Sequence, residues 1–212
     1  MGARILIADD MDLVTHAIRA TLERTPAWVV IGECHALDEV QFALQQQRID
    51  VLICGQQLDP ALDALSLLEQ LRRLSNGARI VMIGTPPDGF LIANLLVCGL
   101  HGYLYRSDPL RECLPVAVET VLRNRPYLSP TAEAEYRVTL QSGRRTRLSG
   151  DERAVLRMLA QGQRVIEIAR TLALPPRRVY GIREKLRRRF GATTNEHLIT
   201  RAVSEGFTYN DN

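Results

Sequence analysis

Residues 175–190, PPRRVYGIREKLRRRF, predict an amphipathic helix whose two sides differ in charge. At 100° per residue, the apolar stripe of this helix holds Val179, Ile182, Leu186 and Phe190. The opposite side holds Arg177, Gly181, Glu184 and Arg188, flanked by Tyr180 and Lys185. Two prolines open the segment, where a helix does not use its N–H groups, and Gly191 follows the last turn. The stretch is therefore a short helix with a basic outer face, unless that face is only a solvated surface.

The residues before this helix favour a functional face. Ser149 is a good N-cap and Glu152 stands three residues later, which is the spacing of a capping box, and Gly162 ends that helix. A second helix is predicted over Val165–Leu172, and the short turn Ala173–Pro175 connects it to the basic helix. Two short helices joined by a tight turn, the second basic outside, predict a helix-turn-helix.

The region Leu148–Ala192 resembles the LuxR/NarL-type DNA-binding domain. The matching residues are Leu148, Ser149, Glu152, Arg153, Val155, Leu156, Leu159, Ala160, Gly162, Glu167, Ile168, Ala169, Leu172, Leu174, Val179, Leu186, Arg188 and Gly191. The resemblance implies an all-α, four-helix domain whose third helix enters the major groove. It also implies that the fourth helix, predicted over Thr194–Val203, carries the dimer contact.

The same resemblance implies DNA-facing roles for one side of the basic helix. Its base-facing candidates are Tyr180, Gly181 and Glu184, and its mainly phosphate-facing candidates are Arg177, Arg178, Lys185 and Arg188. The Glu184 carboxylate can accept from cytosine N4, or it can pair with Arg188 four residues on. A glycine in a helix interior, such as Gly181, lowers stability by about 1 kcal/mol relative to alanine. Close approach of the helix backbone to DNA would explain its presence, and sequence drift is the alternative.

The charge of the chain is divided along its length. Residues 1–142 hold 12 arginines and 17 acidic residues, a balance of −5. Residues 143–212 hold 14 arginines, one lysine and 7 acidic residues, a balance of +8. A basic C-terminal part on an acidic N-terminal part favours a nucleic-acid-binding module on a separate domain. A basic membrane-surface helix is the alternative, but it would lack a compact core.

Short apolar runs alternate with helical patterns over the first 125 residues. The predicted strands are Ala3–Ala8, Trp28–Ile31, Val51–Cys54, Arg79–Ile83 and Gly102–Tyr105. Four of the helices between and after them are predicted over Leu37–Gln47, Leu65–Leu74, Phe90–Cys98 and Leu110–Leu122, and another follows the first strand. This alternation predicts an α/β, flavodoxin-like (βα)5 domain with a functional crevice at the carboxyl ends of its strands.

Residues 3–124 resemble the receiver domain of bacterial response regulators. Asp9 and Asp10 match the magnesium-binding carboxylates of that family, and Gly102–Arg106 matches its Gly-(Tyr/Phe)-Leu-x-Lys sequence. The spacing from Leu58 to Leu68 matches the loop and helix after the phosphorylated aspartate. The resemblance implies a crevice formed by Asp9, Asp10, Gly55, Gly84, Thr85 and Arg106.

Three positions depart from the receiver pattern. Gly55 stands where the phosphoacceptor aspartate belongs, and neither Asp50 nor Asp59 is placed to reach the crevice. The switch Ser/Thr position falls on Gly84, and Arg106 replaces the lysine. We therefore expect no phosphoacceptor. One interpretation is that Arg106 pairs with Asp9 or Asp10 and supplies the positive charge that the metal ion and the lysine supply in the family. The alternative is an ordinary ion pair in a pocket that has lost its function.

Catalytic and metal-binding sequences are not apparent. There is no Gly-rich phosphate loop, nucleophile elbow or paired metal motif, so we expect no enzyme, no catalytic residue, no cofactor and no metal. The widely spaced cysteines Cys34, Cys54, Cys98 and Cys113 are expected to be reduced thiols of a cytosolic protein, with Cys54 in the core. No apolar run approaches the roughly 20 residues that span a bilayer.

The sequence predicts a receiver-like domain over 1–125, a linker over 126–147 with a short helix, and a helix-turn-helix domain over 148–212. The function expected is that of a cytoplasmic transcription regulator. It would bind double-stranded DNA as a homodimer and act independently of aspartyl phosphorylation. The alternative is an adaptor whose receiver-like face binds a partner regulator or a small ligand. No membrane partner is expected.

Overall fold

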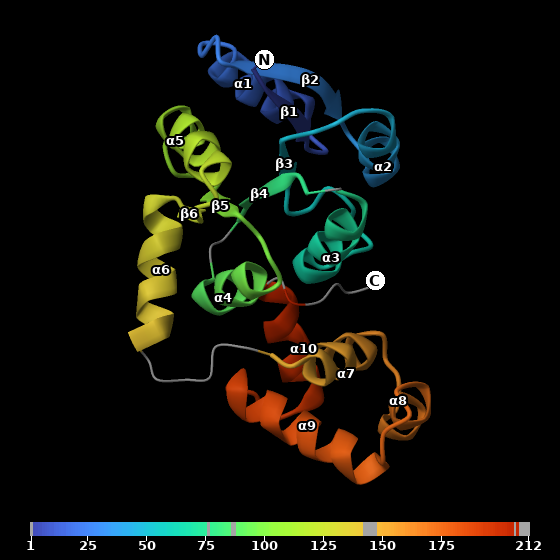
Figure 1. Cartoon of the computed structure of the whole chain (residues 1–212). Helices are drawn as coiled ribbons and strands as arrows, with labels where there is room; N and C mark the ends of the chain where they lie inside the picture. Colours follow the sequence, from blue (N-terminus) through green and yellow to red (C-terminus); the bar gives the residue numbers. More distant parts are fainter. Residues whose placement is uncertain (1, 76, 86–87, 142–147, 206, 208–212) are drawn as a thin grey trace. The chain divides into compact units, whose positions relative to one another are not determined.

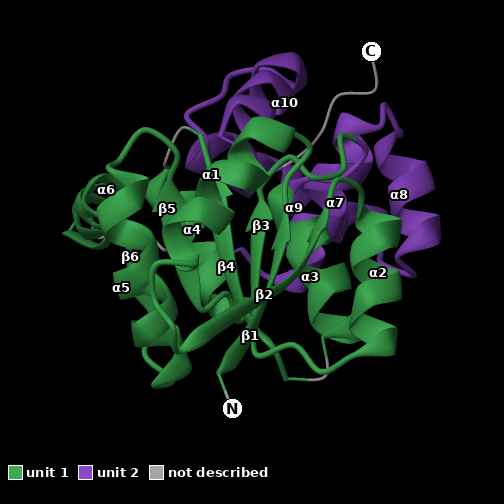
Figure 2. Cartoon of the chain, turned by 90° about the horizontal axis from the view of Figure 1, so that it is seen from above, with its two compact units in different colours: residues 1–60, 64–146 green, residues 61–63, 147–212 purple. Residues whose placement is uncertain are grey.

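A computed structural model of the chain divides into two compact units, drawn in Figures 1 and 2. The described residues are 2–75, 77–85, 88–141, 148–205 and 207. The first unit comprises residues 1–60 and 64–146, and the second comprises 61–63 and 147–212. Residues 142–147, the end of the predicted linker, lie outside the described residues.

The first unit is built on one parallel sheet. Its strands are β1 (Ala3–Ala8), β2 (Trp28–Cys34), β3 (Val51–Gly55), β4 (Arg79–Gly84), β5 (Gly102–Tyr105) and β6 (Tyr127–Leu128). They lie in the order β2-β1-β3-β4-β5-β6, and every neighbouring pair is parallel. The central strand β3 is buried at all five positions, which explains why VLICG reads as an uninterrupted apolar run.

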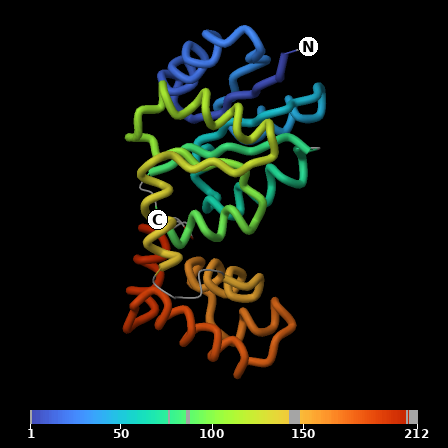
Figure 3. The backbone as a smooth tube through the Cα atoms, turned by 60° about the vertical axis from the view of Figure 1, so that its left-hand side comes forward, coloured from blue at the N-terminus to red at the C-terminus, as the bar shows by residue number. Residues whose placement is uncertain are grey.

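Helices cover both faces of the sheet, as the backbone trace in Figure 3 also shows. On one face, α1 (Asp12–Leu22) and α5 (Leu110–Leu122) pack together over a core that includes Ile7, Ile53 and Leu104. The other face is covered by α2 (Leu37–Gln46), α3 (Ala64–Leu74) and α4 (Gly89–Val97). The predicted α/β receiver-like fold with five βα units is confirmed.

The sheet has one strand more than the sequence predicts. Tyr127 and Leu128 form β6 between two prolines, paired with Gly102 and Tyr103 of β5. The chain then enters α6 (Pro130–Gln141), which packs against α4 and β5. The segment predicted as a linker with a short helix thus contributes a strand and a helix to the first unit.

The second unit contains four helices over its described residues. They are α7 (Gly150–Ala160), α8 (Val165–Thr171), α9 (Pro176–Arg189) and α10 (Asn195–Ser204). Ser149 and Glu152 form the predicted capping box of α7, and Gly162 has the positive φ of 75° that its role after the helix requires. The predicted four-helix domain is confirmed.

Apolar side chains of all four helices form the core of the second unit. Val179 and Leu186 of α9 are buried, as is Phe190 just after it. The Phe190 ring meets Phe207 edge to face, with 5.4 Å between the ring centroids. In the described part of the chain, no helix combines the length and the apolar character needed to cross a membrane.

Candidate functional site

Two strand ends bring a carboxylate and a guanidinium together in the crevice of the first unit. Asp9 follows β1 and is fully buried, while Arg106 follows β5 and is partly exposed. Oδ1 of Asp9 accepts from the backbone N–H of Met11 at 3.1 Å. Its Oδ2 accepts from Nη2 of Arg106 at 2.8 Å. The predicted pairing of Arg106 is thus with Asp9, and Asp10 is exposed.

The Asp9 carboxyl is held in a site that opposes its charge. Burial raises the pKa of Asp9 above its ordinary value, and the hydrogen bond and charge of Arg106 act in the opposite direction. Because burial is the larger effect, Arg106 compensates only part of the desolvation of Asp9. The ionised form of the buried Asp9 carboxyl is therefore stabilised chiefly by the Arg106 guanidinium.

Gly55 leaves room for this ion pair. A β-carbon at residue 55 would lie 2.5 Å from Oδ2 of Asp9, closer than real Cβ contacts. The Asp9 side chain therefore occupies the place where a side chain at position 55 would begin. Asp50 lies before β3, where it accepts from the backbone N–H of Arg4 at 2.9 Å, and Asp59 lies in the turn beyond Gly55.

The crevice residues do not fit a magnesium ion, which the resemblance to receivers implies. Mg²⁺ needs oxygen ligands in near-octahedral geometry. Both oxygens of Asp9 already accept hydrogen bonds, one of them from a cation, and Gly55 offers no side-chain ligand. Among the described residues, no group of three or more His, Cys, Asp or Glu side chains is arranged to hold a metal ion.

A second pair of groups in the crevice was not predicted from the sequence. The hydroxyl of Tyr103, on β5, donates to Oε1 of Gln56 at 2.7 Å, and both side chains are buried. Burial raises the pKa of the Tyr103 phenol, which keeps it protonated. Gly84, at the end of β4, faces this pair, whereas Thr85 is exposed. The sequence feature that could have identified Gln56 as a crevice residue is that it is polar and directly follows β3.

The thiols of Cys34 and Cys54 form no disulfide, and burial suppresses their reactivity. Burial raises the pKa of Cys54 to about 12 and that of Cys34 to about 11. Cys54 is fully buried on β3, as predicted. These two positions are therefore parts of the core.

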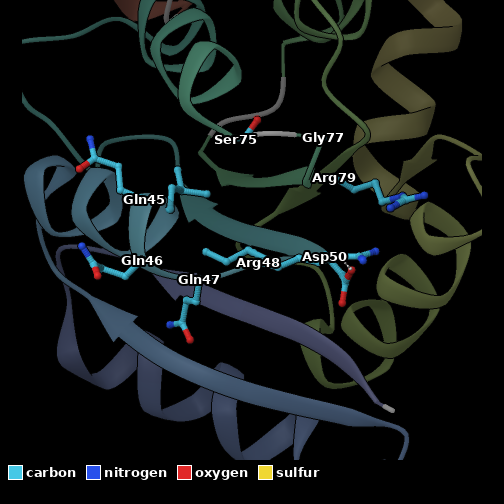
Figure 4. A pocket seen from close by; sticks show the side chains of 10 residues that line it. Gln45, Gln46, Gln47, Arg48, Asp50, Ser75, Gly77 and Arg79 are labelled. Atoms are coloured by element: carbon cyan, nitrogen blue, oxygen red, sulfur yellow. Dashed lines mark ion pairs between the residues drawn. The ribbon is translucent and has the colours of Figure 1, made fainter.

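A polar hollow of about 570 Å³ lies at the opposite edge of the sheet, beside the beginnings of β3 and β4 (Figure 4). Its charged side chains are already bound within the protein. Nε of Arg48 lies 3.4 Å from Oδ1 of Asp50. The Arg79 side chain points away from the hollow, and its Nη2 donates to Oδ1 of Asn124 at 2.9 Å. The hollow therefore does not present a convergent set of ligand-binding groups.

In the second unit, α9 presents a polar outer face opposite its buried stripe. Arg177, Tyr180, Gly181 and Arg188 are exposed on it. Among the described residues, no acidic side chain pairs with Arg177 or Arg188. No atom lies within 4 Å of the place of a β-carbon at Gly181. These positions form a surface of uncompensated positive charge with an open strip of backbone.

Glu184 lies on the same face and is bound by two arginines. Its Oε1 lies 3.1 Å from Nη2 of Arg183 and 3.1 Å from Nη1 of Arg187. The hydrogen bond from Arg183, together with the charge of Arg187, lowers the pKa of Glu184. The pairing of Glu184 with Arg188, an alternative offered by the sequence, is therefore wrong. Arg183 also lies over the Tyr180 ring, 5.0 Å from its centroid, so these side chains form one connected row.

Two other basic residues of α9 are bound to acids of α7. Nη2 of Arg178 lies 2.7 Å from Oδ2 of Asp151. The Lys185 ammonium pairs with Glu152, which also receives Nη1 of Arg189 at 3.4 Å. Arg178 and Lys185, predicted from the resemblance to face phosphate, therefore also connect α7 with α9.

The buried Glu152 carboxylate has two structural roles. It accepts from the backbone N–H of Ser149 at 2.7 Å in the capping box, and it binds Lys185 and Arg189 of α9. Burial opposes its ionisation, but these hydrogen bonds and charges outweigh burial and lower its pKa. The capping box was visible in the sequence, whereas its link to α9 was not, because it needs the crossing of two helices.

Two protein-family models match the chain. Residues 5–112 match the model described as "Response regulator receiver domain". Residues 146–202 match the model described as "Bacterial regulatory proteins, luxR family". The first match spans half of the chain, from β1 to the first turn of α5, and the second includes α7, α8 and α9.

Individual proteins resemble the chain over nearly its whole length. The transcriptional regulatory protein UhpA of Escherichia coli (strain K12) is 29% identical over 197 residues, which are 93% of this chain and 96% of UhpA. The virulence factors putative positive transcription regulator BvgA of Bordetella pertussis is 26% identical over 204 residues, 94% of this chain and 96% of BvgA. A structure of RcsB from Salmonella enterica serovar Typhimurium, bound to promoter rprA in the presence of phosphomimetic BeF3−, has a TM-score of 0.68 and 21% identity. That comparison covers 95% of this chain and 98% of RcsB.

Proposed function

Because this chain belongs to the response regulators, we propose that it is a DNA-binding transcription regulator whose receiver domain works without aspartyl phosphorylation. The observation that carries DNA binding is the outer face of α9. There, Arg177 and Arg188 are exposed and unpaired among the described residues, on a helix held by a buried apolar stripe. Such a face suits the phosphates and base edges of a major groove.

The residues of α9 divide into two sets by what they would contact. Arg177 and Arg188 bind phosphates. Arg178 and Lys185 are held in ion pairs, and they add to the positive potential that attracts the phosphates. Tyr180, Gly181 and Glu184 face base edges, where the Glu184 carboxylate accepts from cytosine N4. Gly181 lets the helix backbone approach the DNA, since no atom surrounds the place of its missing side chain.

The protein acts as a homodimer on paired DNA sites. A single short helix reads too few base pairs for useful specificity, whereas two copies on a two-fold axis read two half-sites. In keeping with this, a related solved structure, 21% identical to this chain, is described as two RcsB dimers bound to two parallel DNAs. We assign the dimer contact of the C-terminal domain to α10 and the chain to the cytoplasm.

Gly55 supports control without an acyl phosphate. It has no side chain, and the space above it is filled by Asp9 and Arg106. The protein therefore performs no phosphoryl chemistry of its own, and its input is an effector, either a protein or a small ligand, that binds the receiver-like domain. Incubation of the full chain with acetyl phosphate and Mg²⁺, followed by intact-mass measurement, tests this. An adduct of about 80 Da would contradict it.

DNA binding is tested with the full chain and a library of fragments from the genome that encodes it. We expect selective retention of a few fragments, each protected over two half-sites, with an affinity that falls steeply as salt rises. The variant Arg177→Ala/Arg188→Ala should lose retention of all fragments. Arg48→Ala, which changes an exposed arginine of the first unit, is the matched control. Equal retention of every fragment, or of none, would instead favour the adaptor function.

A further inference from the structure

One edge of the sheet in the first unit borders an open hollow. β2 is the last strand on that side, so its outer backbone edge has no neighbouring strand among the described residues (Figure 1). Between β2 and α2 lies a hollow of about 560 Å³, here called the β2 groove. Leu6, Gly32 and Cys34 line it from the sheet, and Phe42 and Ala43 line it from α2. The β2 groove therefore follows the free edge of a strand.

Gly32 keeps the β2 groove open. It pairs with Leu6 of β1, and a β-carbon at position 32 would lie 3.3 Å from Cδ1 of Leu6. Apart from its chain neighbours, no other atom of the described residues lies within 4 Å of that place. A glycine within a strand often marks a position where another backbone approaches closely. The missing side chain thus leaves room beside β2 for a side chain of another molecule.

Phe42 is a large apolar side chain that the first unit leaves uncovered. α2 buries Leu37, Val40 and Leu44, whereas 65% of Phe42 is exposed. An aromatic ring beside a groove is a typical anchor for a partner, because covering the ring removes apolar surface from water. An extended segment along β2 would bond to the free backbone groups of the strand and cover this ring at the same time.

The charged side chains at the β2 groove are acidic. Asp38 and Glu39, in the first turn of α2, line it and are exposed. One oxygen of Glu39 accepts from the backbone N–H of His35 at 2.7 Å, and the carboxylate of Glu33 is bound to Arg19 of α1. Among the described residues that line the groove, none is lysine or arginine. The charge of Asp38 and Glu39 therefore favours a segment that carries lysine or arginine.

The same features disfavour other occupants. A second copy of this chain would bring its own β2, whose sequence WVVIGEC supplies no cation to the acidic groove. The register of β1 and β2 also shifts at Ile31, and such a bulge interrupts the regular edge that two long strands need for pairing. Nucleic acids and anionic lipids are repelled by the acidic side chains.

The β2 groove is joined to the crevice through Asp9. The backbone N–H of Asp9 donates to the carbonyl of Cys34 at 3.1 Å, and Nδ1 of His35 lies 3.1 Å from the carbonyl oxygen of Asp9. Cys34 and His35 both line the groove. A segment bound along β2 would thus contact the residues that hold the backbone of Asp9, whose side chain binds Arg106.

We propose that the β2 groove is where the receiver-like domain binds its effector, and that this effector is an extended, cationic segment of a partner protein. The backbone of the segment pairs with the free edge of β2. One of its apolar side chains fills the space at Gly32 and covers Phe42, and its lysine or arginine faces Asp38 and Glu39. This inference rests on the proposed binding of an effector to the receiver-like domain, but it does not require that the chain bind DNA.

The test uses the full chain and labelled peptides of about nine residues, in which lysine alternates with valine or leucine so that one face of the extended peptide is apolar. We expect saturable binding by fluorescence anisotropy and slower hydrogen exchange over residues 28–34 of β2. The same peptides with glutamate in place of lysine should bind at least about tenfold more weakly. Methylation of alternate backbone nitrogens should also abolish binding, because the peptide then cannot pair with β2.

Substitutions in the chain locate the binding site. Phe42→Ala and the double variant Asp38→Asn/Glu39→Gln should each weaken binding of the lysine peptides by about tenfold or more. Gly32→Val fills the groove and should abolish binding. Val138→Ala, at an exposed valine of α6, is the matched control and should change nothing. Because Phe42, Asp38 and Glu39 are exposed, their variants should fold normally even if Gly32→Val does not.

Three outcomes would overturn the proposal. These are no binding by any lysine peptide, equal binding of the glutamate peptides, and binding by Phe42→Ala and by the double variant that equals that of the unaltered protein. Any of them would remove the groove as the effector site but leave DNA binding intact, because the retention of DNA fragments does not involve the groove. An adduct with acetyl phosphate would instead contradict the proposed mode of control.

Discussion

Arg106 donates from Nη2 to Oδ2 of Asp9 at 2.8 Å, across 97 residues of sequence. The carboxylate is fully buried, and the guanidinium is the one cation of the described residues found against it. A buried charge without its partner is strongly destabilising, whereas removal of both partners together can be almost neutral. The stability of the first unit should therefore depend measurably on Arg106.

We expect Arg106→Ala to destabilise the protein by about 3–5 kcal/mol, since it leaves the Asp9 carboxyl buried without a cation. Adding Asp9→Asn should restore much of that loss. Urea unfolding of the two single variants and the double variant measures the coupling. Arg123→Ala is the comparison, since its pair with Glu119 is exposed and should contribute less than about 1 kcal/mol. Additive losses at Asp9 and Arg106 would contradict the pairing.

The buried Glu152 predicts a pH dependence for the C-terminal domain. Its pKa in the folded chain lies below the ordinary 4.5, so its ionised form favours folding. That contribution is complete above about pH 4.5 and is lost as the pH falls through the lowered pKa. We expect thermal unfolding of Glu152→Gln to occur at a lower temperature at pH 7, with the difference from the unaltered protein shrinking toward pH 3. A constant difference would exclude the role of its charge.

The two unpaired arginines of α9 should act on every DNA sequence alike. Arg177→Ala and Arg188→Ala should each reduce the slope of log affinity against log salt concentration by about 0.9, without a change in the preferred site. Glu184→Ala should leave that slope nearly unchanged and alter the preferred base pair. Binding-site selection at two salt concentrations separates these effects. If Glu184→Ala changes neither quantity, its function is to hold Arg183 and Arg187.

The Arg178–Asp151 pair predicts a gain of affinity. Asp151→Asn removes the acidic partner that lies 2.7 Å from Arg178, so the guanidinium becomes available to phosphate. Non-specific DNA binding should tighten roughly threefold, with a salt slope larger by up to about 0.9. Fluorescence anisotropy with a duplex of unrelated sequence gives both numbers. Asp59→Asn in the first unit controls for the change of net charge, and an equal gain there would contradict the local explanation.

Gly181 predicts opposite effects on stability and binding. Gly181→Ala should stabilise the C-terminal domain by up to about 1 kcal/mol, because α9 has open space there and alanine favours a helix. The same methyl group should weaken specific DNA binding if the backbone of α9 lies against the bases. Denaturant unfolding and site-specific anisotropy measure the two effects. Unchanged affinity would identify Gly181 as sequence drift.

Much of the fold could be predicted from local pattern. The apolar run Val51–Cys54, flanked by Asp50 and Gly55, predicted a buried strand between helices. Gly162 and the capping box at Ser149 mark helix ends through backbone chemistry that acts over a few residues. For the same reason, the apolar stripe of Val179 and Leu186 predicted which side of α9 is buried. Local sequence patterns were sufficient to predict the structure wherever the interacting residues are close together in the sequence.

The remainder depended on contacts between distant residues. Tyr127 and Leu128 form β6 only because β5 offers a free edge, and two residues between prolines carry no strand pattern of their own. The partners of Glu152 lie 33 and 37 residues away on a crossing helix. The Tyr103–Gln56 hydrogen bond likewise follows from the neighbouring strands β3, β4 and β5, which periodicity does not reveal.

The strand β6 and the helix α6 determine where the chain can be divided for biochemistry. A fragment that ends at Leu122 would expose the unpaired edge of β5 and the apolar surface of α4, both of which promote aggregation. A fragment that ends at Gln141 keeps both covered. We therefore expect the longer fragment to remain soluble and monodisperse at concentrations at which the shorter one precipitates.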